Sequence, residues 1–251
     1  MKILSWNICS DNKKQPEKLK QLLQKYDPDV VCLQEVSLEC SDSINEYEGY
    51  HIIQAIDYYS LKKKEKAEHR LVLLSKLPIL NKDSENKFSI SDLTKISLWE
   101  RINKWQESFE FQYAELAYEG QNIKIFNVHF EVGAGPYIRF KQFLKTTEKF
   151  NDNGHNVICG DFNIYGKWYK NIIIGWAMGF SFKEMFIDER RRFQKLFKAH
   201  GLQNPFYRKI TYPMFALQLD HILVPQGWQI KKVELIKNRF GSDHRPIMLE
   251  V

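Results

Sequence analysis

Carboxylate, amide and imidazole side chains lie at the ends of the apolar, strand-like runs of this chain. Such groups can hold a hard metal ion and transfer protons. A single polar residue at a strand end is more often a cap or a turn former. In layered α/β folds, however, the ligand crevice forms where strand ends meet, so the whole set predicts one shared site. The set comprises Asn7 (KILSWN), Glu35 (VVCLQE), His129 (KIFNVH), Asp161 and Asn163 (NVICGDFN), Asp220 (LDHILV), and Asp243 with His244 (GSDHRPIMLEV).

Helix-like segments separate several of these runs. Residues 16–26, 137–150 and 189–199 space their apolar side chains as one helical face does, and Pro16 occupies a favoured helix-start position. Strands interleaved with helices predict α/β layering. The runs FEFQYAELAY and NIKIFNVHF, joined by a Glu-Gly-Gln turn, predict an antiparallel hairpin, so mixed sheets are favoured over purely parallel ones. No internal repeat or linker is present, and we predict a single domain over residues 1–251.

The composition is that of a folded globular protein. The chain has 251 residues, of which 43% are hydrophobic and 14% aromatic, which is enough for one substantial core. No apolar stretch reaches the length that crosses a bilayer, and the N-terminal residues lack the layout of a signal peptide. The four cysteines form no zinc-ligand spacing. We therefore predict a monomeric, cytoplasmic protein with reduced thiols.

The net charge of +6 is unevenly distributed along the chain. Clusters of basic residues are usually solvated surface. They also suit a polyanionic partner, because neutralising phosphates supplies most non-specific affinity for nucleic acid. Composition does not choose between these two interpretations. The clusters are Lys62, Lys63, Lys64 and Lys66; Arg190, Arg191 and Arg192; Arg208 and Lys209; and Lys231 and Lys232.

Six short motifs follow one another along the chain: WN, LQE, NVHF, GDFN, LDHI and SDHRP, from residue 5 to the C-terminus. In this order and spacing they resemble the endonuclease/exonuclease/phosphatase superfamily, which includes DNase I, exonuclease III-type nucleases, sphingomyelinases and inositol phosphatases. The resemblance implies a four-layer α/β sandwich, in which two mixed β-sheets pack face to face with helices outside (a DNase I-like fold). It also implies divalent-metal-dependent cleavage of phosphate esters.

On this interpretation the residue types match the needs of phosphate ester hydrolysis, which requires positive charge and an activated water. Mg²⁺ is typically held by only one or two carboxylates, so Glu35 is the first candidate metal ligand. Asn7 is a supporting ligand or orienter, and Asp243 completes the metal environment. Asp161 would align or deprotonate the attacking water, and Asn163 would position the phosphate.

Two histidines are predicted to face the phosphate. His244 would act as a general base or as a donor to the developing charge, with Asp220 holding its imidazole in one tautomer. The resemblance to DNase I-like members implies that His129 protonates the leaving oxygen. It also implies that Glu68 in AEHRLVLLS is the carboxylate partner of His129, the alternative being a plain surface charge. His221 follows Asp220 on a strand, so its side chain points to the opposite face and is predicted to be structural.

Arg139, Glu68 and Trp168 are further candidates for substrate binding. Trp168 belongs to YGKWYKNIIIGWAMGF, residues 165–180, an apolar and aromatic segment that directly follows GDFN. This segment is predicted to contain a helix packed on the sheet. The alternatives are a base-stacking platform for single-stranded nucleic acid or a patch that inserts into a lipid interface or a partner.

Two positions depart from the exonuclease III pattern. Those enzymes usually carry an acidic residue two positions after the WN asparagine, where this chain has Cys9, and a tyrosine in place of His129. Residues 188–223 nevertheless resemble the exonuclease III order of a helix, GL, a tyrosine-aromatic turn and a strand. The aromatic loop that those enzymes use around abasic sites is shortened here to TYPMF.

The sequence therefore predicts a Mg²⁺-dependent phosphodiesterase, with Mn²⁺ as a substitute, that hydrolyses phosphate esters in nucleic acid as a DNA nuclease or a DNA-end-processing enzyme. A phosphoesterase acting on a membrane phospholipid or an inositol phosphate is the alternative, since an apolar segment is combined with surface lysines. A binding module without catalysis is disfavoured, because every member of the polar set is present.

Overall fold

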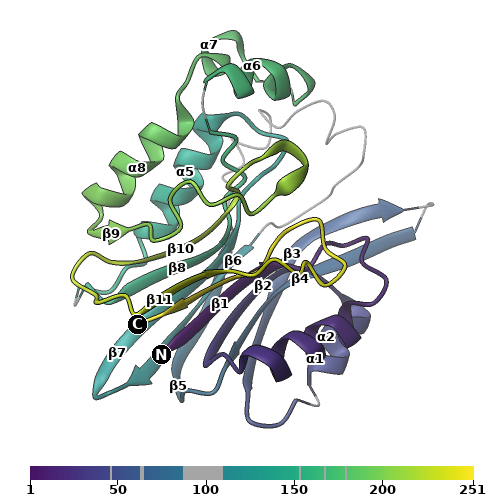
Figure 1. Cartoon of the computed structure of the whole chain (residues 1–251), viewed down its shortest axis with the longest axis vertical. Helices are drawn as coiled ribbons and strands as arrows, with labels where there is room; N and C mark the ends of the chain where they lie inside the picture. The colour runs from purple at the N-terminus through teal and green to yellow at the C-terminus, as the bar shows by residue number, and fades with distance from the viewer. Residues whose placement is uncertain (46, 63–64, 87–109, 153, 167, 179) are drawn as a thin grey trace.

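The computed structural model describes the chain except residues 46, 63–64, 87–109, 153, 167 and 179 and the side chains of some of their neighbours. Its described strands form two six-stranded mixed sheets. The sheets pack face to face, and helices cover their outer faces (Figure 1). The predicted four-layer α/β sandwich is therefore confirmed.

The first sheet is built around a central parallel pair. In spatial order it contains β11 (Lys232–Leu235), β12 (Ile247–Glu250), β1 (Lys2–Asn7), β2 (Val30–Ser37), β4 (Glu65–Ser75) and β3 (His51–Lys62). β1 and β2 run parallel, and the other neighbours pair antiparallel. β1 and β2 are apolar on both faces because one face meets the second sheet and the other meets helices.

The second sheet repeats this plan. In spatial order it contains β5 (Ile79–Asn86), β6 (Glu110–Tyr118), β7 (Gln121–His129), β8 (Asn156–Asp161), β10 (Asp220–Pro225) and β9 (Leu202–Gln203). β7 and β8 form its parallel pair. The predicted hairpin is β6–β7, whose two-residue loop has Glu119 and Gly120 at φ 49° and 76°, as a type I′ turn requires.

The three predicted helices are confirmed close to their predicted ranges. α1 (Gln15–Tyr26) and the short α2 (Leu38–Ile44) cover the first sheet, and α5 (Pro136–Thr147) and α8 (Glu189–Ala199) cover the second (Figure 1). Proline in the first turn starts α1 and α5. α6 (Trp168–Ala177), α7 (Phe182–Met185) and the 3₁₀ turn η1 (Pro213–Phe215) are shorter. No described helix is long and apolar enough to cross a membrane.

Apolar side chains from both sheets fill the space between them. Ile3, Cys32 and Leu73 of the first sheet belong to the same cluster as Ile125 and Ile222 of the second. The four cysteines are free thiols. This core holds the two sheets together, so the ends of their strands keep a constant separation.

The two parallel pairs direct functional side chains to one end of the sandwich. Asn7 ends β1, and Glu35 lies two residues before the end of β2. His129 ends β7, and Asp161 ends β8. Since the carboxyl ends of parallel strands share one edge of a sheet, the predicted polar residues of both sheets meet at this end.

Candidate active site

A pocket opens at this end of the sandwich, and six of the eight predicted polar residues line it. The other two, Asn7 and Asp220, are buried behind the lining residues, 1% and 0% exposed. The structure thus brings all eight members of the set together. The six that line the pocket are Glu35, His129, Asp161, Asn163, Asp243 and His244.

A β-bulge places Glu35 in the pocket. Between Leu33 and Val36, two residues of β2 oppose one residue of β4. Glu35 adopts a left-handed backbone conformation (φ 58°), which costs a non-glycine residue about 1 kcal/mol or more. The bulge lets consecutive side chains diverge: Gln34 enters the space between the sheets, while Glu35 faces the pocket.

Three amide side chains tie the sheets together beneath the pocket; we call Gln34, Gln112 and Asn127 the amide ladder. All three are 0% exposed. Gln34 Nε2 donates to Asn127 Oδ1 at 2.7 Å across the interface. Asn127 Nδ2 donates to the carbonyl of Leu33 and Gln112 Nε2 to that of Leu71, both at 3.0 Å. These two carbonyls lie beside the bulge, where hydrogen bonding between β2 and β4 is interrupted. Side-chain amides of the opposite sheet therefore donate the hydrogen bonds that the carbonyls need.

Asn7 joins the two halves of the site. Its Nδ2 donates to Glu35 Oε1 (2.9 Å) on the first sheet and to Asp161 Oδ2 (3.1 Å) on the second. Its Oδ1 accepts a hydrogen bond from the backbone N–H of Cys9 (3.0 Å), so the amide is held as an orienter of two carboxylates. Burial would raise the pKa of Glu35, but His129 and the Asn7 hydrogen bond hold that pKa below its usual value.

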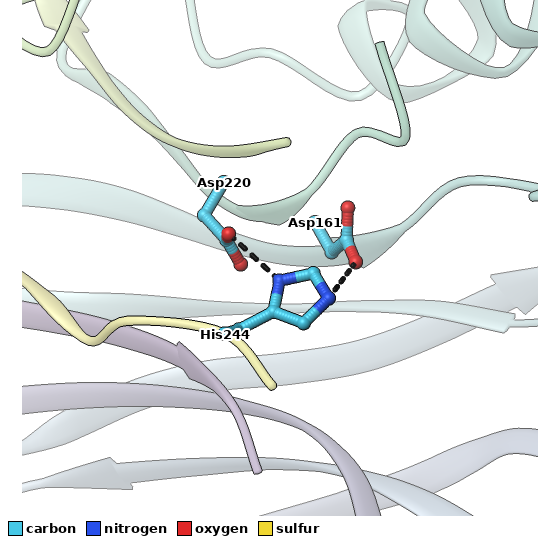
Figure 2. A group of neighbouring side chains, drawn as sticks. All are labelled: Asp161, Asp220 and His244. Carbon is cyan, nitrogen blue, oxygen red and sulfur yellow. Dashed lines mark hydrogen bonds and ion pairs between the residues drawn. The ribbon is translucent and has the colours of Figure 1, made fainter. Parts of the chain in front are cut away.

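His244 is held between two carboxylates, as Figure 2 shows. Its Nδ1 donates to Asp220 Oδ2 at 2.9 Å, and its Nε2 lies 3.7 Å from Asp161 Oδ2. Burial alone would lower the pKa of His244, but Asp220 and Asp161 raise it to about 10. The ring is therefore an imidazolium at neutral pH, and its Nε2 is directed at the pocket.

His129 has the same arrangement with respect to Asp161. Its Nδ1 donates to Asp57 Oδ2 at 2.8 Å, and its Nε2 lies 3.9 Å from Asp161 Oδ2. Burial alone would lower the pKa of His129, but Asp57 and the other carboxylates raise it to about 9. Asp57 also accepts a hydrogen bond from the backbone N–H of Glu35 (3.1 Å). It is a functional residue that the sequence analysis missed.

The partner of His129 comes from β3 and not, as predicted, from β4. A second bulge, directly before Tyr58, lets Asp57 and Tyr58 both line the pocket. Glu68 instead pairs with Arg70, with 2.7 Å between Oε1 and Nε, since residues two apart on a strand share a face. The prediction that Glu68 contacts His129 is therefore wrong.

Arg139 does not reach the pocket. Its side chain is 0% exposed and pairs with Glu189 at 2.6 Å. Its Nη1 donates to the carbonyls of Glu131 and Ala134, which belong to the segment between β7 and α5. The prediction that Arg139 contacts the substrate is wrong. Its buried side chain instead stabilises the backbone of the segment that forms one wall of the pocket. Trp168 begins α6, but its side chain lies outside the described part of the chain.

His221 is structural, as predicted. Its Nδ1 accepts hydrogen bonds from the side-chain amides of Asn204 and Gln218, both at 3.2 Å. The ring packs 4.8 Å from that of Phe162. Burial lowers the pKa of His221 to about 3, so the ring is neutral at physiological pH.

Acid is expected to destabilise the protein through His221. Its pKa in the folded protein, about 3, lies below the unfolded value of about 6.5, so the unfolded chain binds the proton first. The free energy of unfolding therefore falls as the pH drops below about 6.5, by about 2 kcal/mol at about pH 5 from this residue. Urea titrations near pH 7.5 and pH 5 measure the loss, which should be smaller in His221→Gln. Equal losses in both proteins would show that His221 is not the cause.

The pocket fits a divalent cation. Six carboxylates surround the two imidazoles among the described residues, and Mg²⁺ prefers such oxygen donors. Asp161, Asp220 and His244 offer ligand atoms within 4.8 Å of one another, but Asp220 Oδ2 already accepts the hydrogen bond of His244 Nδ1. A cation therefore fits better beside Glu35. The six carboxylates are Glu35, Asp57, Glu131, Asp161, Asp220 and Asp243.

Two further polar residues complete the site. Asp243 lines the pocket near Cys9, and burial, Glu35 and Asp243 raise the pKa of that thiol to about 12. Asn163 has a left-handed backbone (φ 50°), and its Nδ2 donates to the Phe130 carbonyl at 2.8 Å. Its second amide hydrogen remains for a ligand.

Another wall of the pocket is apolar and aromatic. The Tyr212 ring lies 4.9 Å from that of His244, which joins this wall to the polar one. Residues 165–180 contain the predicted helix, α6, but it lies beside α7 at the end of the sandwich and not on a sheet as predicted (Figure 1). Residues on either side of α6 reach the pocket. The apolar wall consists of Val132, Tyr165, Met178, Tyr212, Phe215, Leu217 and Leu219.

The chain is similar in sequence to known proteins. Residues 4–244 match the model of the Endonuclease/Exonuclease/phosphatase family. The chain is 26% identical over 290 residues to Exodeoxyribonuclease III of Haemophilus influenzae, with 100% of this chain and 99% of that protein covered.

Solved structures share the fold. An endonuclease/exonuclease/phosphatase from Beutenbergia cavernae has a TM-score of 0.72 at 12% identity, over 99% of this chain and 70% of that chain. A 3′ phosphatase from Neisseria, bound to a product DNA hairpin, has a TM-score of 0.62 at 20% identity, over 100% and 98%. At these identities the likeness shows the fold alone, and the family match covers nearly the whole sequence. The chain belongs to the endonuclease/exonuclease/phosphatase family.

Proposed function

We propose that this phosphoesterase uses Mg²⁺ to hydrolyse phosphate ester bonds in nucleic acid, as a nuclease or a DNA-end-processing enzyme. The observation that supports this most is the pair of imidazoles facing Asp161. His129 and His244 lie 3.9 and 3.7 Å from Asp161 Oδ2, and a buried aspartate holds each ring. Positive donors arranged in this way around one point suit an anionic phosphate that gains charge during hydrolysis.

Glu35, with Asp161 and Asp243, would hold the metal ion. When bound, Mg²⁺ polarises the phosphate and activates a water molecule. Asn7 keeps the carboxylates of Glu35 and Asp161 turned toward each other. Asn163 offers an amide hydrogen to a phosphate oxygen. Mn²⁺ also suits carboxylate and water ligands, so we expect it to substitute.

Asp161, His244 and His129 have separate roles in proton transfer and charge stabilisation. Asp161 aligns the attacking water or accepts its proton. His244, as an imidazolium, donates to a phosphate oxygen, and Asp220 prevents its ring from turning. His129 delivers its proton to the leaving oxygen, with Asp57 behind it.

Relatives, charge and aromatic surface together support a nucleic acid as the substrate. One relative is named Exodeoxyribonuclease III, and one structural neighbour is bound to a product DNA hairpin. The net charge of +6 favours a polyanion. Tyr212 and Phe215, 6.0 Å apart in the apolar wall, offer faces on which a base can stack.

A phospholipid or an inositol phosphate is the second candidate substrate. Phe182 of α7 and Phe186, which directly follows this helix, form a ring pair 5.1 Å apart. Phe182 is 75% exposed, and Met214 in η1 is 67% exposed. Exposed apolar side chains of this kind can insert into a lipid interface.

Cleavage assays separate the two candidates. The purified protein is incubated with Mg²⁺ and labelled DNA or RNA, including nicked, abasic and 5′-tyrosyl substrates, and in parallel with liposomes containing phosphoinositide or sphingomyelin. Nucleic-acid products that disappear with EDTA and in Glu35→Gln are the expected result. Phosphate release from the lipids alone would favour the second candidate. Failure to cleave any nucleic acid would refute the proposal.

A further inference from the structure

Two loops beside the pocket carry four exposed basic residues. Residues 9–14 come shortly after Asn7, and residues 237–242 run directly into Asp243 and His244. Figure 1 shows the loop after β1 beside the loop before β12. We call residues 9–14 and 237–242 the basic loop pair. Its exposed cations are Lys13, Lys14, Lys237 and Arg239.

Asn12 fixes these two loops to each other. Its Nδ2 donates to the carbonyls of Ile8 (3.3 Å) and Phe240 (3.2 Å). Gly241 has φ 91°, and a Cβ there would lie 2.8 Å from Asn12 Oδ1, so this close approach requires glycine. The cations are therefore carried on a pre-organised surface, which reduces the entropy lost when a ligand binds.

The chemistry of the basic loop pair is cationic and polar. Within the described part of the chain, none of its four cations forms an ion pair with an acidic side chain. The aromatic ring of Phe240 is buried, so the loops present no exposed aromatic group. A lipid interface requires apolar side chains to insert, and the exposed Phe182 and Met214 belong to other elements, α7 and η1. Positive charge without apolar surface is typical of contacts to a phosphodiester backbone.

We infer that the basic loop pair binds the phosphodiester backbone of the nucleic-acid strand whose scissile phosphate lies in the pocket. This inference rests on the proposed function and adds the surface that holds the substrate next to the site. The first loop begins two residues after Asn7, and the second runs directly into Asp243. A strand bound along the loops therefore continues into the pocket.

The test compares two variants of the full chain that lose equal charge. The loop variant carries Lys13→Gln, Lys14→Gln, Lys237→Gln and Arg239→Gln. The control variant removes exposed lysines of α1 and α8 and carries Lys20→Gln, Lys25→Gln, Lys195→Gln and Lys198→Gln. Fluorescence anisotropy measures binding of labelled duplex and single-stranded DNA in EDTA over a series of NaCl concentrations.

Loss of four phosphate contacts is expected to reduce the slope of log K against log[NaCl] by about 3.6 for duplex DNA and about 2.8 for single strands. At about 0.15 M NaCl this corresponds to an affinity about 100-fold lower or more. The control variant should keep the wild-type slope. With Mg²⁺, the loop variant should hydrolyse the small diester bis(p-nitrophenyl) phosphate as wild type does, while its kcat/KM on DNA falls.

Each other outcome identifies what has failed. A loop variant that binds and cleaves DNA as the control does would overturn the inference and leave the proposed function intact. If wild type hydrolyses neither DNA nor the small diester, the proposed function fails and the inference fails with it. Loop-dependent binding of phosphatidylserine vesicles without DNA binding would overturn the inference in favour of a membrane surface.

Discussion

Replacing His244 with alanine is expected to lower kcat by about 10³-fold. The variant loses the imidazolium that Asp220 anchors at 2.9 Å and that faces Asp161 at 3.7 Å. His129 does not compensate, because Asp57 holds its ring by Nδ1 through a separate hydrogen bond. Steady-state kinetics at saturating Mg²⁺, on a nucleic acid that wild type cleaves, measure the effect.

The control is His51→Ala, which removes an exposed histidine of β3 and should leave kcat unchanged. Alanine at position 244 also leaves Asp220 buried without its partner, so the free energy of unfolding falls as well. Activity is therefore measured well below the melting temperature, with folding checked by circular dichroism. A folded His244→Ala that keeps more than about a tenth of the wild-type kcat would exclude the proposed role.

Replacing Arg139 with methionine is expected to lower the free energy of unfolding by about 3–5 kcal/mol. The Arg139 and Glu189 side chains are both 0% exposed, so the variant leaves an uncompensated buried carboxylate. The carbonyls of Glu131 and Ala134 also lose their donor. Urea denaturation followed by circular dichroism measures the change.

Two comparisons isolate the ion pair. Lys145→Met removes a charge from the same helix at a less buried position and should cost far less. The double variant Arg139→Met/Glu189→Leu buries no unpaired charge and should recover much of the loss. If Arg139→Met alone costs less than about 1 kcal/mol, the buried pair contributes little to stability.

The strand-end residues of the site could be predicted because alternation and apolar runs are local properties of a sequence. Asn7, Glu35, His129 and Asp161 each end, or nearly end, such a run, and both parallel pairs bring those ends to one place. The fold was predicted from the order of the six sequence motifs. The sandwich and the strand-end residues of the site could therefore be predicted from apolar runs and motif order.

Asp57 was missed because its partner lies on another sheet. It lies in the middle of β3, where Ile53, Ala55 and Asp57 alternate on one buried face. An acid on a buried face is a signal that an ion partner is present, but only the packing of the sheets shows that the partner is His129. The bulge that lets Asp57 and Tyr58 both line the pocket leaves no local pattern in the sequence.

Arg139 was misjudged for a related reason. Helical periodicity indicates which residues share a face, but it does not identify a partner 50 positions away, and Glu189 is at that distance in the chain. A charged residue on a predicted helix is usually exposed. Here two charged residues from α5 and α8 meet in the interior, which a single sequence does not reveal.

The amide ladder has a consequence for how proteins of this architecture diversify. Gln112 and Asn127 of the second sheet donate to backbone carbonyls of the first, and Gln34 of the first donates to Asn127. Sliding the sheets by one residue would therefore leave buried polar groups unmatched. We therefore expect exchange of the segments around α6 and η1, which take no part in the ladder, to leave the spacing of Glu35 and Asp161 unchanged. Grafting such segments from a relative onto this scaffold should transfer substrate preference without rebuilding the reaction.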